Sequence, residues 1–279
     1  MKILFSSKCL EYRHPGHPES PERISRVYES LRNEFEFVKA KPCKEEDILR
    51  VHSFQMLQAV KNLEPWVFDP DTPPEDNIYF YASLAAGGAI QAAELALSGE
   101  NSFSLLRPPG HHAIRTKAMG FCYFNNIAIA CSKLLDSAEK TAILDLDCHH
   151  GNGTQDIFLG NPRILYVSLH QSPLYPGTGL TSQSNCVNFP LPPGTTELQY
   201  LKILETGIKQ IKKFNPDILG ISMGFDTYKN DPLGGLALEE KSYKKISEIV
   251  FNLQIPCFSV LEGGYSKEMP VLIKNFLKP

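Results

Sequence analysis

Short apolar runs alternate along the chain with longer amphipathic segments, and this alternation constrains the fold more than any other feature. The runs that we expect to be strands are residues 3–5, 102–105, 141–146, 164–169, 218–223 and 257–261. They lack a regular exchange of apolar and polar residues, which is typical of parallel strands buried on both faces. The expected helices are residues 21–35, 79–97, 124–136, 195–213 and 238–252. This order predicts an α/β fold with a central, mostly parallel sheet flanked by helices.

Composition narrows the classes of protein to which the chain can belong. Its 279 residues show no repeat and no break in composition, so we expect one domain over residues 1–279. A net charge of −3 provides no basic field for a nucleic acid or an acidic membrane. No apolar stretch reaches the ~18 residues of a membrane span, and no secretory signal is present. Seven cysteines without a CxxC pair indicate a reducing compartment, so we expect a cytoplasmic protein. Separately, we expect the chain to act as a monomer.

Polar residues are concentrated just after the predicted strands. The segments are residues 107–112, 145–153, 168–170, 224–226 and 262–265. In open parallel sheets, ligands bind beyond the carboxyl ends of the strands. The segments are therefore expected to converge on one site, and a stiff loop with His14, His17 and neighbouring prolines is a candidate for its rim.

Two of these segments contain residue types that commonly act as metal ligands. In extended chain Asp147 and His149 point the same way, so both can reach one cation, and Asp226 is the natural third ligand. Carboxylate and imidazole ligands suit zinc, cobalt, iron or manganese rather than calcium. Three protein ligands leave room for water and substrate, which indicates a catalytic site.

The paired histidines His111 and His112 are the best candidates for proton transfer. They follow a stiff Pro-Pro-Gly turn, in which both rings can face a cavity, and imidazole titrates near neutral pH. Asp145 and Asn152 are the available partners to orient the rings. Tyr265 follows two glycines and could donate a hydrogen bond to a developing oxyanion, although a tyrosine that only packs is the alternative.

The motifs RPPGHHA, GFCYFNN, DLDCHHGNGTQ, SLH, PGTG, GFD and LEGGY occur in this order. The set resembles the histone deacetylase family, which includes acetoin-utilisation and acetylpolyamine amidohydrolase branches. RPPGHH, Asn152 and Glu262 resemble its class II pattern. The resemblance implies an arginase/deacetylase-like α/β fold with one divalent ion, Zn²⁺ or alternatively Fe²⁺ or Co²⁺, together with K⁺.

The resemblance also implies a role for each motif residue. Tyr265 would polarise the acyl carbonyl, His112 with Asn152 would be the general base and acid, and His111 with Asp145 would act electrostatically. The implied zinc ligands are Asp147, His149 and Asp226. The implied potassium ligands are Asp145, Asp147, His149, Ser168 and Leu169.

Substrate contacts are implied by resemblance as well. Phe121, preceded by Gly120, and Tyr175 would flank the methylenes of an acyl-lysine, and Asp71 would hold its backbone amides. Leu233 stands where polyamine-specific relatives carry a glutamate, which favours a neutral acyl-lysine.

The sequence thus predicts a zinc-dependent amidohydrolase that removes an acyl group, foremost acetyl, from the ε-amine of lysine in proteins or peptides. A deacetylase of acetylpolyamines or other small amides is the alternative. A non-catalytic acyl-lysine binder is a third reading, against which the complete set of catalytic residues argues. A single ligand set also argues against a binuclear manganese arginase.

Overall fold

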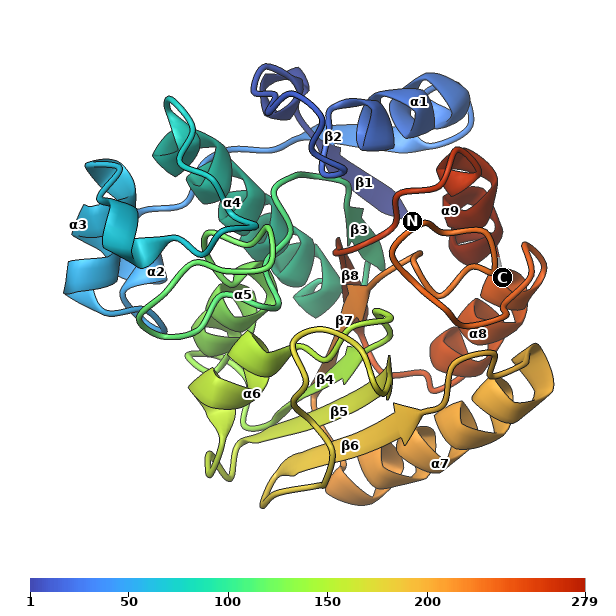
Figure 1. Ribbon diagram of the computed structural model, residues 1–279. Helices are drawn as coiled ribbons and strands as arrows, with labels where there is room; N and C mark the ends of the chain where they lie inside the picture. The colour runs from blue at the N-terminus through green and yellow to red at the C-terminus, as the bar shows by residue number, and fades with distance from the viewer. Residues whose placement is uncertain (279) are drawn as a thin grey trace.

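One sheet of parallel strands forms the centre of residues 1–278, which are the residues that the computed structural model describes (Figure 1). Its strands are β1 (Lys2–Phe5), β2 (Glu36–Lys39), β3 (Ser102–Ser104), β4 (Thr141–Asp145), β5 (Ile164–Gln171), β6 (Cys186–Leu191), β7 (Ile218–Met223) and β8 (Cys257–Leu261). They lie in the order β2-β1-β3-β8-β7-β4-β5-β6, and every neighbouring pair is parallel. The predicted α/β fold is confirmed, and the sheet is parallel throughout.

Helices cover both faces of this sheet (Figure 1). One layer contains α1 (Glu22–Leu31), α7 (Glu197–Phe214), α8 (Ser242–Phe251) and α9 (Met269–Leu277). The other contains α4 (Ile78–Leu97) and α5 (Asn126–Leu134), with α2 (Glu45–Ile48), α3 (Phe54–Lys61) and α6 (Asn152–Phe158) beside them. Two short 3₁₀ turns, η1 (Ser7–Leu10) and η2 (Pro65–Val67), complete the elements.

Successive residues of a strand serve two separate hydrophobic cores. On β4, Leu144 packs into the core under α7 and α8, whereas its neighbour Ile143 packs into the core under α4 and α5. Both side chains are fully buried. A central strand of this kind needs apolar residues at every position, which is why it appears in the sequence as a continuous apolar run.

The structure contains two strands and four helices that the sequence analysis did not predict. Strands β2 and β6 lie at the two sheet edges; Glu36 and Lys39 are exposed on β2, and Pro190 interrupts the apolar run of β6. The unpredicted helices are α2, α3, α6 and α9. In α9, Pro270 looks like a breaker but occupies the first turn, where proline costs no hydrogen bond.

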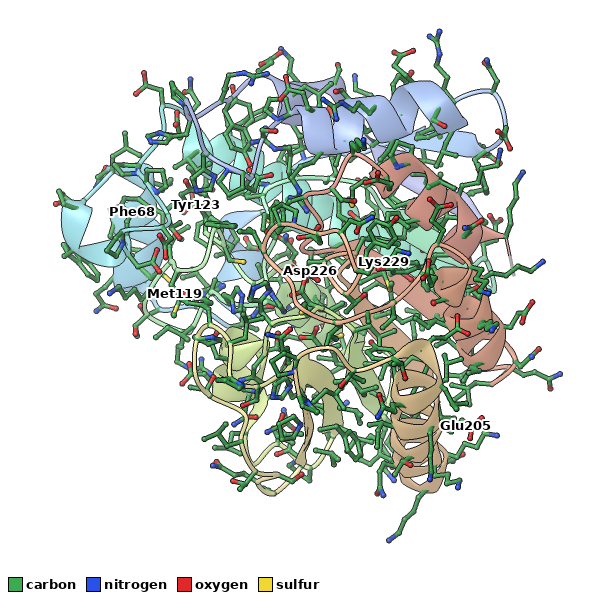
Figure 2. All side chains as sticks on the ribbon, turned by 45° about the vertical axis from the view of Figure 1, so that its right-hand side comes forward. Phe68, Met119, Tyr123, Glu205, Asp226 and Lys229 are labelled. Atoms are coloured by element: carbon green, nitrogen blue, oxygen red, sulfur yellow. The ribbon has the colours of Figure 1, made fainter. Side chains whose placement is uncertain are left out.

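The order of strands brings the polar segments to one place. Strands β3, β8, β7, β4 and β5 are consecutive neighbours. Four of the segments begin at or within three residues of the end of β3, β8, β7 or β4, whereas residues 168–170, expected to follow a strand, lie within β5 because that strand extends to Gln171. Asp226, which follows β7, lies near the middle of the view in Figure 2, whereas Glu205 of α7 lies at its periphery. No helix within residues 1–278 is both long and apolar enough to cross a membrane.

Candidate active site

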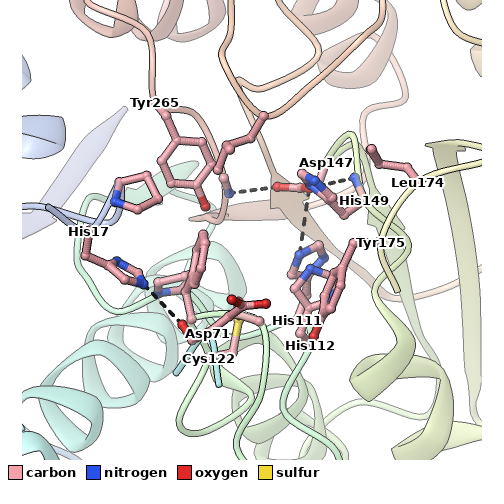
Figure 3. Close-up of a pocket in the computed structure, with 16 residues that line it drawn as sticks. His17, Asp71, His111, His112, Cys122, Asp147, His149, Leu174, Tyr175 and Tyr265 are labelled. Carbon is pink, nitrogen blue, oxygen red and sulfur yellow. Dashed lines mark hydrogen bonds and ion pairs between the residues drawn. The ribbon is translucent and has the colours of Figure 1, made fainter. Parts of the chain in front are cut away.

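A cavity of about 420 Å³ opens at the carboxyl ends of the central strands (Figure 3). Its deep part is lined by the polar side chains His111, His112, Asp147 and His149. Its walls include Phe121, Tyr175, Leu233 and Tyr265, and the N-terminal loop contributes His17. Three of the five predicted segments, residues 107–112, 145–153 and 262–265, therefore contribute lining residues, whereas residues 168–170 do not line the cavity. The expected rim loop contributes His17 and Pro18 but not His14.

Asp147, His149 and Asp226 converge at the bottom of this cavity. One potential ligand atom from each lies within 4.8 Å of the others. Nδ1 of His149 lies 3.0 Å from Oδ1 of Asp147 and 2.9 Å from Oδ2 of Asp226. The predicted grouping of these three residues is thus present, with two residues after β4 and one after β7.

The surroundings of these three side chains fit a divalent cation. The second oxygen of each carboxylate accepts a backbone N–H, from Gly263 at 2.7 Å for Asp147 and from Cys148 at 2.8 Å for Asp226. Such contacts fix the direction of a ligand. The space is also tight, because a Cβ on Gly224 would lie 2.2 Å from Oδ2 of Asp147. Two carboxylates and one imidazole are a donor set that zinc accepts.

His111 and His112 stand side by side beneath the aromatic walls, with ring centroids 4.0 Å apart. Nδ1 of His111 lies 3.1 Å from Oδ2 of Asp145. Nδ1 of His112 lies 2.8 Å from Oδ1 of Asn152. Both predicted partnerships are therefore present, one with a carboxylate and one with a neutral amide.

The surroundings of the two imidazoles shift their pKa values in opposite directions. Burial alone would lower the pKa of His111, but Asp145 and Asp147 outweigh it and raise that pKa to about 10. Burial, together with repulsion from His111 and His149, holds the pKa of His112 well below its ordinary value. Groups in one cavity whose pKa values are driven apart are suited to different tasks in proton transfer. These directions favour a neutral His112, which can accept a proton, beside a protonated His111.

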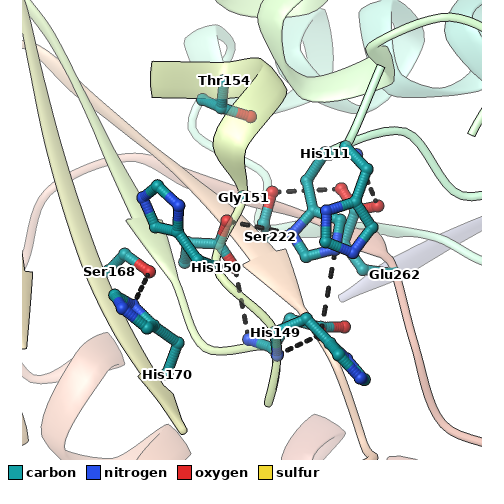
Figure 4. A network of polar contacts seen from close by, with 12 residues as sticks. His111, His149, His150, Gly151, Thr154, Ser168, His170, Ser222 and Glu262 are labelled. Atoms are coloured by element: carbon teal, nitrogen blue, oxygen red, sulfur yellow. Dashed lines mark hydrogen bonds and ion pairs between the residues drawn. The ribbon is translucent and has the colours of Figure 1, made fainter. Parts of the chain in front are cut away.

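Glu262 supports the histidine turn in a way that the sequence did not reveal. Its buried Oε2 accepts the N–H of Gly110 at 2.7 Å and of His111 at 3.1 Å, while Oε1 accepts the Ser222 hydroxyl at 3.0 Å (Figure 4). Burial raises the pKa of this carboxyl to about 7. The contacts tie β7 and β8 to the turn that carries both histidines.

Comparison with known proteins agrees with this geometry. The family model of the histone deacetylase domain matches residues 17–275. A probable deacetylase of Archaeoglobus fulgidus is 39% identical, with 95% of this chain and 81% of the relative covered. A histone deacetylase-like amidohydrolase of Pseudomonas aeruginosa is 34% identical, with 90% and 73% covered.

The chain belongs to the histone deacetylase family. A crystal structure of acetylpolyamine aminohydrolase from Burkholderia pseudomallei has the same fold, with a TM-score of 0.94 at 26% identity, covering 99% of this chain and 97% of that one. Membership of this deacetylase and amidohydrolase family makes the chain an enzyme that hydrolyses acyl amides.

The residues predicted to contact substrate all line the cavity of this deacetylase-family chain: Gly120, Phe121, Tyr175, Leu233 and Asp71. Tyr175 is half-exposed, and its ring stands nearly perpendicular to that of His112, with centroids 5.1 Å apart. Phe121 faces Tyr265 edge-on at 5.9 Å. The structure adds Asp69, which accepts the Tyr175 hydroxyl at 3.3 Å and the N–H of Gly120 at 3.1 Å. No sequence pattern pointed to Asp69.

Of the residues predicted to hold potassium, Asp147 and His149 line the cavity, whereas Asp145 lies on β4 and Ser168 and Leu169 lie on β5. Asp145 is paired with Ser168 in the register of these strands, and Leu169 follows Ser168. All three are fully buried. The Ser168 hydroxyl lies 2.9 Å from Nδ1 of His170 (Figure 4). The five predicted residues are thus neighbours in the fold.

Proposed function

We propose that this chain is a zinc-dependent deacylase that removes an acyl group, foremost acetyl, from the ε-amine of lysine in proteins or peptides. One observation carries the proposal. Three side chains that can hold a divalent cation lie together with two histidines whose pKa values are shifted in opposite directions. The hydroxyl of Tyr265 points into the same cavity (Figure 3). Hydrolysis of an amide needs these same functions.

Each residue of the chain has a separate task in this proposal. Asp147, His149 and Asp226 would hold the divalent ion, whose chemistry is Lewis-acid activation of water and of the amide carbonyl. His112, oriented by Asn152, accepts a proton from the attacking water and later donates one to the leaving amine.

Two further groups stabilise the charge that develops in the transition state. The His111 side chain, kept protonated by Asp145, contributes a fixed positive charge in a water-poor site. Tyr265 donates a hydrogen bond to the acyl oxygen. Removing one such donor typically slows turnover by about 10²–10³-fold.

The walls of the cavity support an uncharged, narrow acyl chain as substrate. Phe121 and Tyr175 would flank the lysine methylenes, Leu233 offers no charge for a distant ammonium, and Asp71 at the rim would accept backbone amides. Small acylated amines are the second candidate, which the likeness to an acetylpolyamine aminohydrolase supports.

We extend the proposal to the ions and the setting of the enzyme. Zinc is the proposed metal, with Fe²⁺ or Co²⁺ as alternatives, and K⁺ is proposed at Asp145, Asp147, His149, Ser168 and Leu169. The whole of residues 1–279 would act as one catalytic domain and as a monomer. Seven free cysteines support the cytoplasm as its compartment.

The experiment is a substrate screen of the zinc-loaded enzyme against acyl-lysine peptides of increasing acyl length, with acetylpolyamines as competitors. Tyr265→Phe and His112→Ala are expected to lose at least ~100-fold in kcat. Tyr28→Phe, which removes a hydroxyl on α1 outside the cavity, is the matched control. Removal of the metal by a chelator should abolish turnover, and added Zn²⁺ should restore it. Wild-type turnover by Tyr265→Phe would refute the mechanism, and a preference for acetylpolyamines would transfer the proposal to the second candidate.

A further inference from the structure

The turn that carries Tyr265 has little means of holding its own shape. Two glycines, Gly263 and Gly264, precede the tyrosine, and Gly264 has a φ of +120° that side-chain-bearing residues rarely adopt. Glycines allow the sharp approach to the metal ligands, but they supply no side chain that packs or hydrogen-bonds. The position of the tyrosine must therefore be fixed by groups from elsewhere in the chain.

The buried carboxylate of Asp231 binds the amide side of this turn. Its Oδ2 accepts the N–H of Tyr265 at 2.7 Å and the N–H of Ser266 at 3.1 Å. Its Oδ1 accepts the N–H of Leu233 at 3.0 Å. Only 6% of Asp231 is exposed, so these charge-assisted bonds are poorly screened by water. One carboxylate thus joins the turn after β8 to the loop after β7.

The carbonyl side of the same turn is held by a different group. Nε of Arg23, on α1, donates to the carbonyl oxygen of Gly264 at 2.7 Å, and the guanidinium carbon lies 4.5 Å from the centre of the Tyr265 ring. Arg23 holds carbonyls and the ring, whereas Asp231 holds the two N–H groups. Neither residue can replace the other, because one has only donors and the other only acceptors.

We propose that Asp231 is a positioning residue for the reaction, which sets the place of the Tyr265 hydroxyl and links it to the Leu233 wall. This inference rests on the proposed function, in which the tyrosine polarises the acyl carbonyl. A small rotation of the turn moves the Tyr265 hydroxyl further than it moves the backbone, because the full length of the tyrosine side chain separates the two. Misplacement of a reacting group by about 1 Å can cost ~10²-fold in rate.

The first test is Asp231→Asn, which preserves shape but leaves one acceptor oxygen where two are used. The amide NH₂ must then face either the Tyr265 turn or the N–H of Leu233. We expect kcat to fall at least ~10-fold, with KM within ~3-fold of the wild-type value. Asp217→Asn is the matched control: its carboxylate also accepts two backbone N–H groups, from Glu139 at 2.7 Å and Lys140 at 2.9 Å, but none of these residues lines the cavity. The control should retain wild-type kcat.

A double variant separates positioning from a general loss of structure. If Asp231 acts through the Tyr265 hydroxyl, D231N/Y265F will be no slower than Y265F alone. If the two losses multiply, the proposal is overturned, and wild-type kcat in Asp231→Asn overturns it as well. Asp231→Glu keeps the charge and shifts the carboxylate oxygens by one methylene, so it should lower kcat less than Asp231→Asn does. Combined with Tyr265→Phe, it should likewise be no slower than Tyr265→Phe alone. This variant replaces Asp231→Asn in the test if the asparagine variant does not fold.

A crystal structure of Asp231→Asn provides a readout that does not depend on activity. The Tyr265 hydroxyl should be displaced or spread over several positions, while the pair His111 and Asp145 keeps its contact. An unmoved hydroxyl would overturn the inference. If the wild-type enzyme hydrolyses no acyl amide, the proposed function is wrong. The position of the Tyr265 hydroxyl in the variant structure would still show whether Asp231 holds the turn.

Discussion

The buried ion pair between Glu19 and Arg107 allows a quantitative test of how the N-terminal loop is fixed. Arg107 is fully buried, and its Nε and Nη2 donate to the two carboxylate oxygens of Glu19 at 2.7 and 2.6 Å. Arg23 donates to the same carboxylate at 3.1 Å. The perturbation is Glu19→Gln, which keeps the shape of the side chain and removes its charge.

The expected loss follows from the carboxyl pKa. Burial alone would raise the pKa of Glu19, but Arg107 and Arg23 outweigh it and lower the pKa from 4.5 to about 2. A shift of this size corresponds to about 3 kcal/mol of unfolding free energy at pH 7. Breaking a buried pair by removing one partner costs a similar ~3–5 kcal/mol. Because the pKa is depressed, this stability is present above pH 4.5 and is lost as the pH falls towards 2.

The assay is urea unfolding of wild type and Glu19→Gln, followed by circular dichroism at pH 7 and pH 3. The difference in unfolding free energy should be about 3 kcal/mol at pH 7 and about half of that at pH 3. Glu22→Gln is the control. Arg13 lowers the pKa of Glu22 to about 2 as well, but the Glu22 side chain is 41% exposed, so solvent screening should keep its effect below ~1 kcal/mol. An equal difference at both pH values for Glu19→Gln, or one below ~1 kcal/mol, would refute the reasoning.

Three further outcomes are expected. Burial lowers the pKa of His52 from 6.5 to about 4, so the stability that its neutral ring contributes is present above pH 6.5 and is lost as the pH falls to 4. In urea unfolding, the unfolding free energy of wild type should therefore fall by about 2 kcal/mol more than that of His52→Gln between pH 7 and pH 4.5. Equal decreases in the two proteins would contradict this. In native protein, Ellman's reagent should modify at most Cys43, and slowly, because the other cysteines are buried and partial burial raises the pKa of Cys43 to about 12. In thermal melts, Gly264→Ala should lower the melting temperature more than Gly160→Ala. Both glycines have positive φ, but a Cβ at Gly264 would lie 2.5 Å from the Met269 sulfur, whereas a Cβ at Gly160 would meet nothing within 4 Å. Equal decreases in melting temperature would show that the contact with Met269 relaxes.

The sequence was informative about the interior of the sheet and uninformative about its edges. Strands such as β4 and β7 are buried on both faces, so their composition alone indicates them. Strand β2 is half-exposed and β6 contains Pro190, so neither shows an apolar run, and both form because a neighbouring strand offers its edge.

The same distinction applies to the candidate site. His111, His112, Asp147 and His149 could be found because short spacing within a motif places them together. Glu262 and Asp231 act on backbone N–H groups of segments that are distant in sequence, and an N–H group is the same in almost every residue. No pattern of residue types encodes such a partnership, and only the fold reveals it.

The position of β8 between β3 and β7 affects how this enzyme comes into being during synthesis. β8 is the last strand of the described chain, yet it completes the middle of the sheet. The earlier strands cannot close their central gap until residues 257–261 have left the ribosome, and parallel pairings between distant segments form slowly. Until then the exposed sides of β3 and β7 offer unpaired backbone groups to other chains. The feature that assembles the site from neighbouring strands therefore also makes activity one of the last properties that the nascent chain acquires.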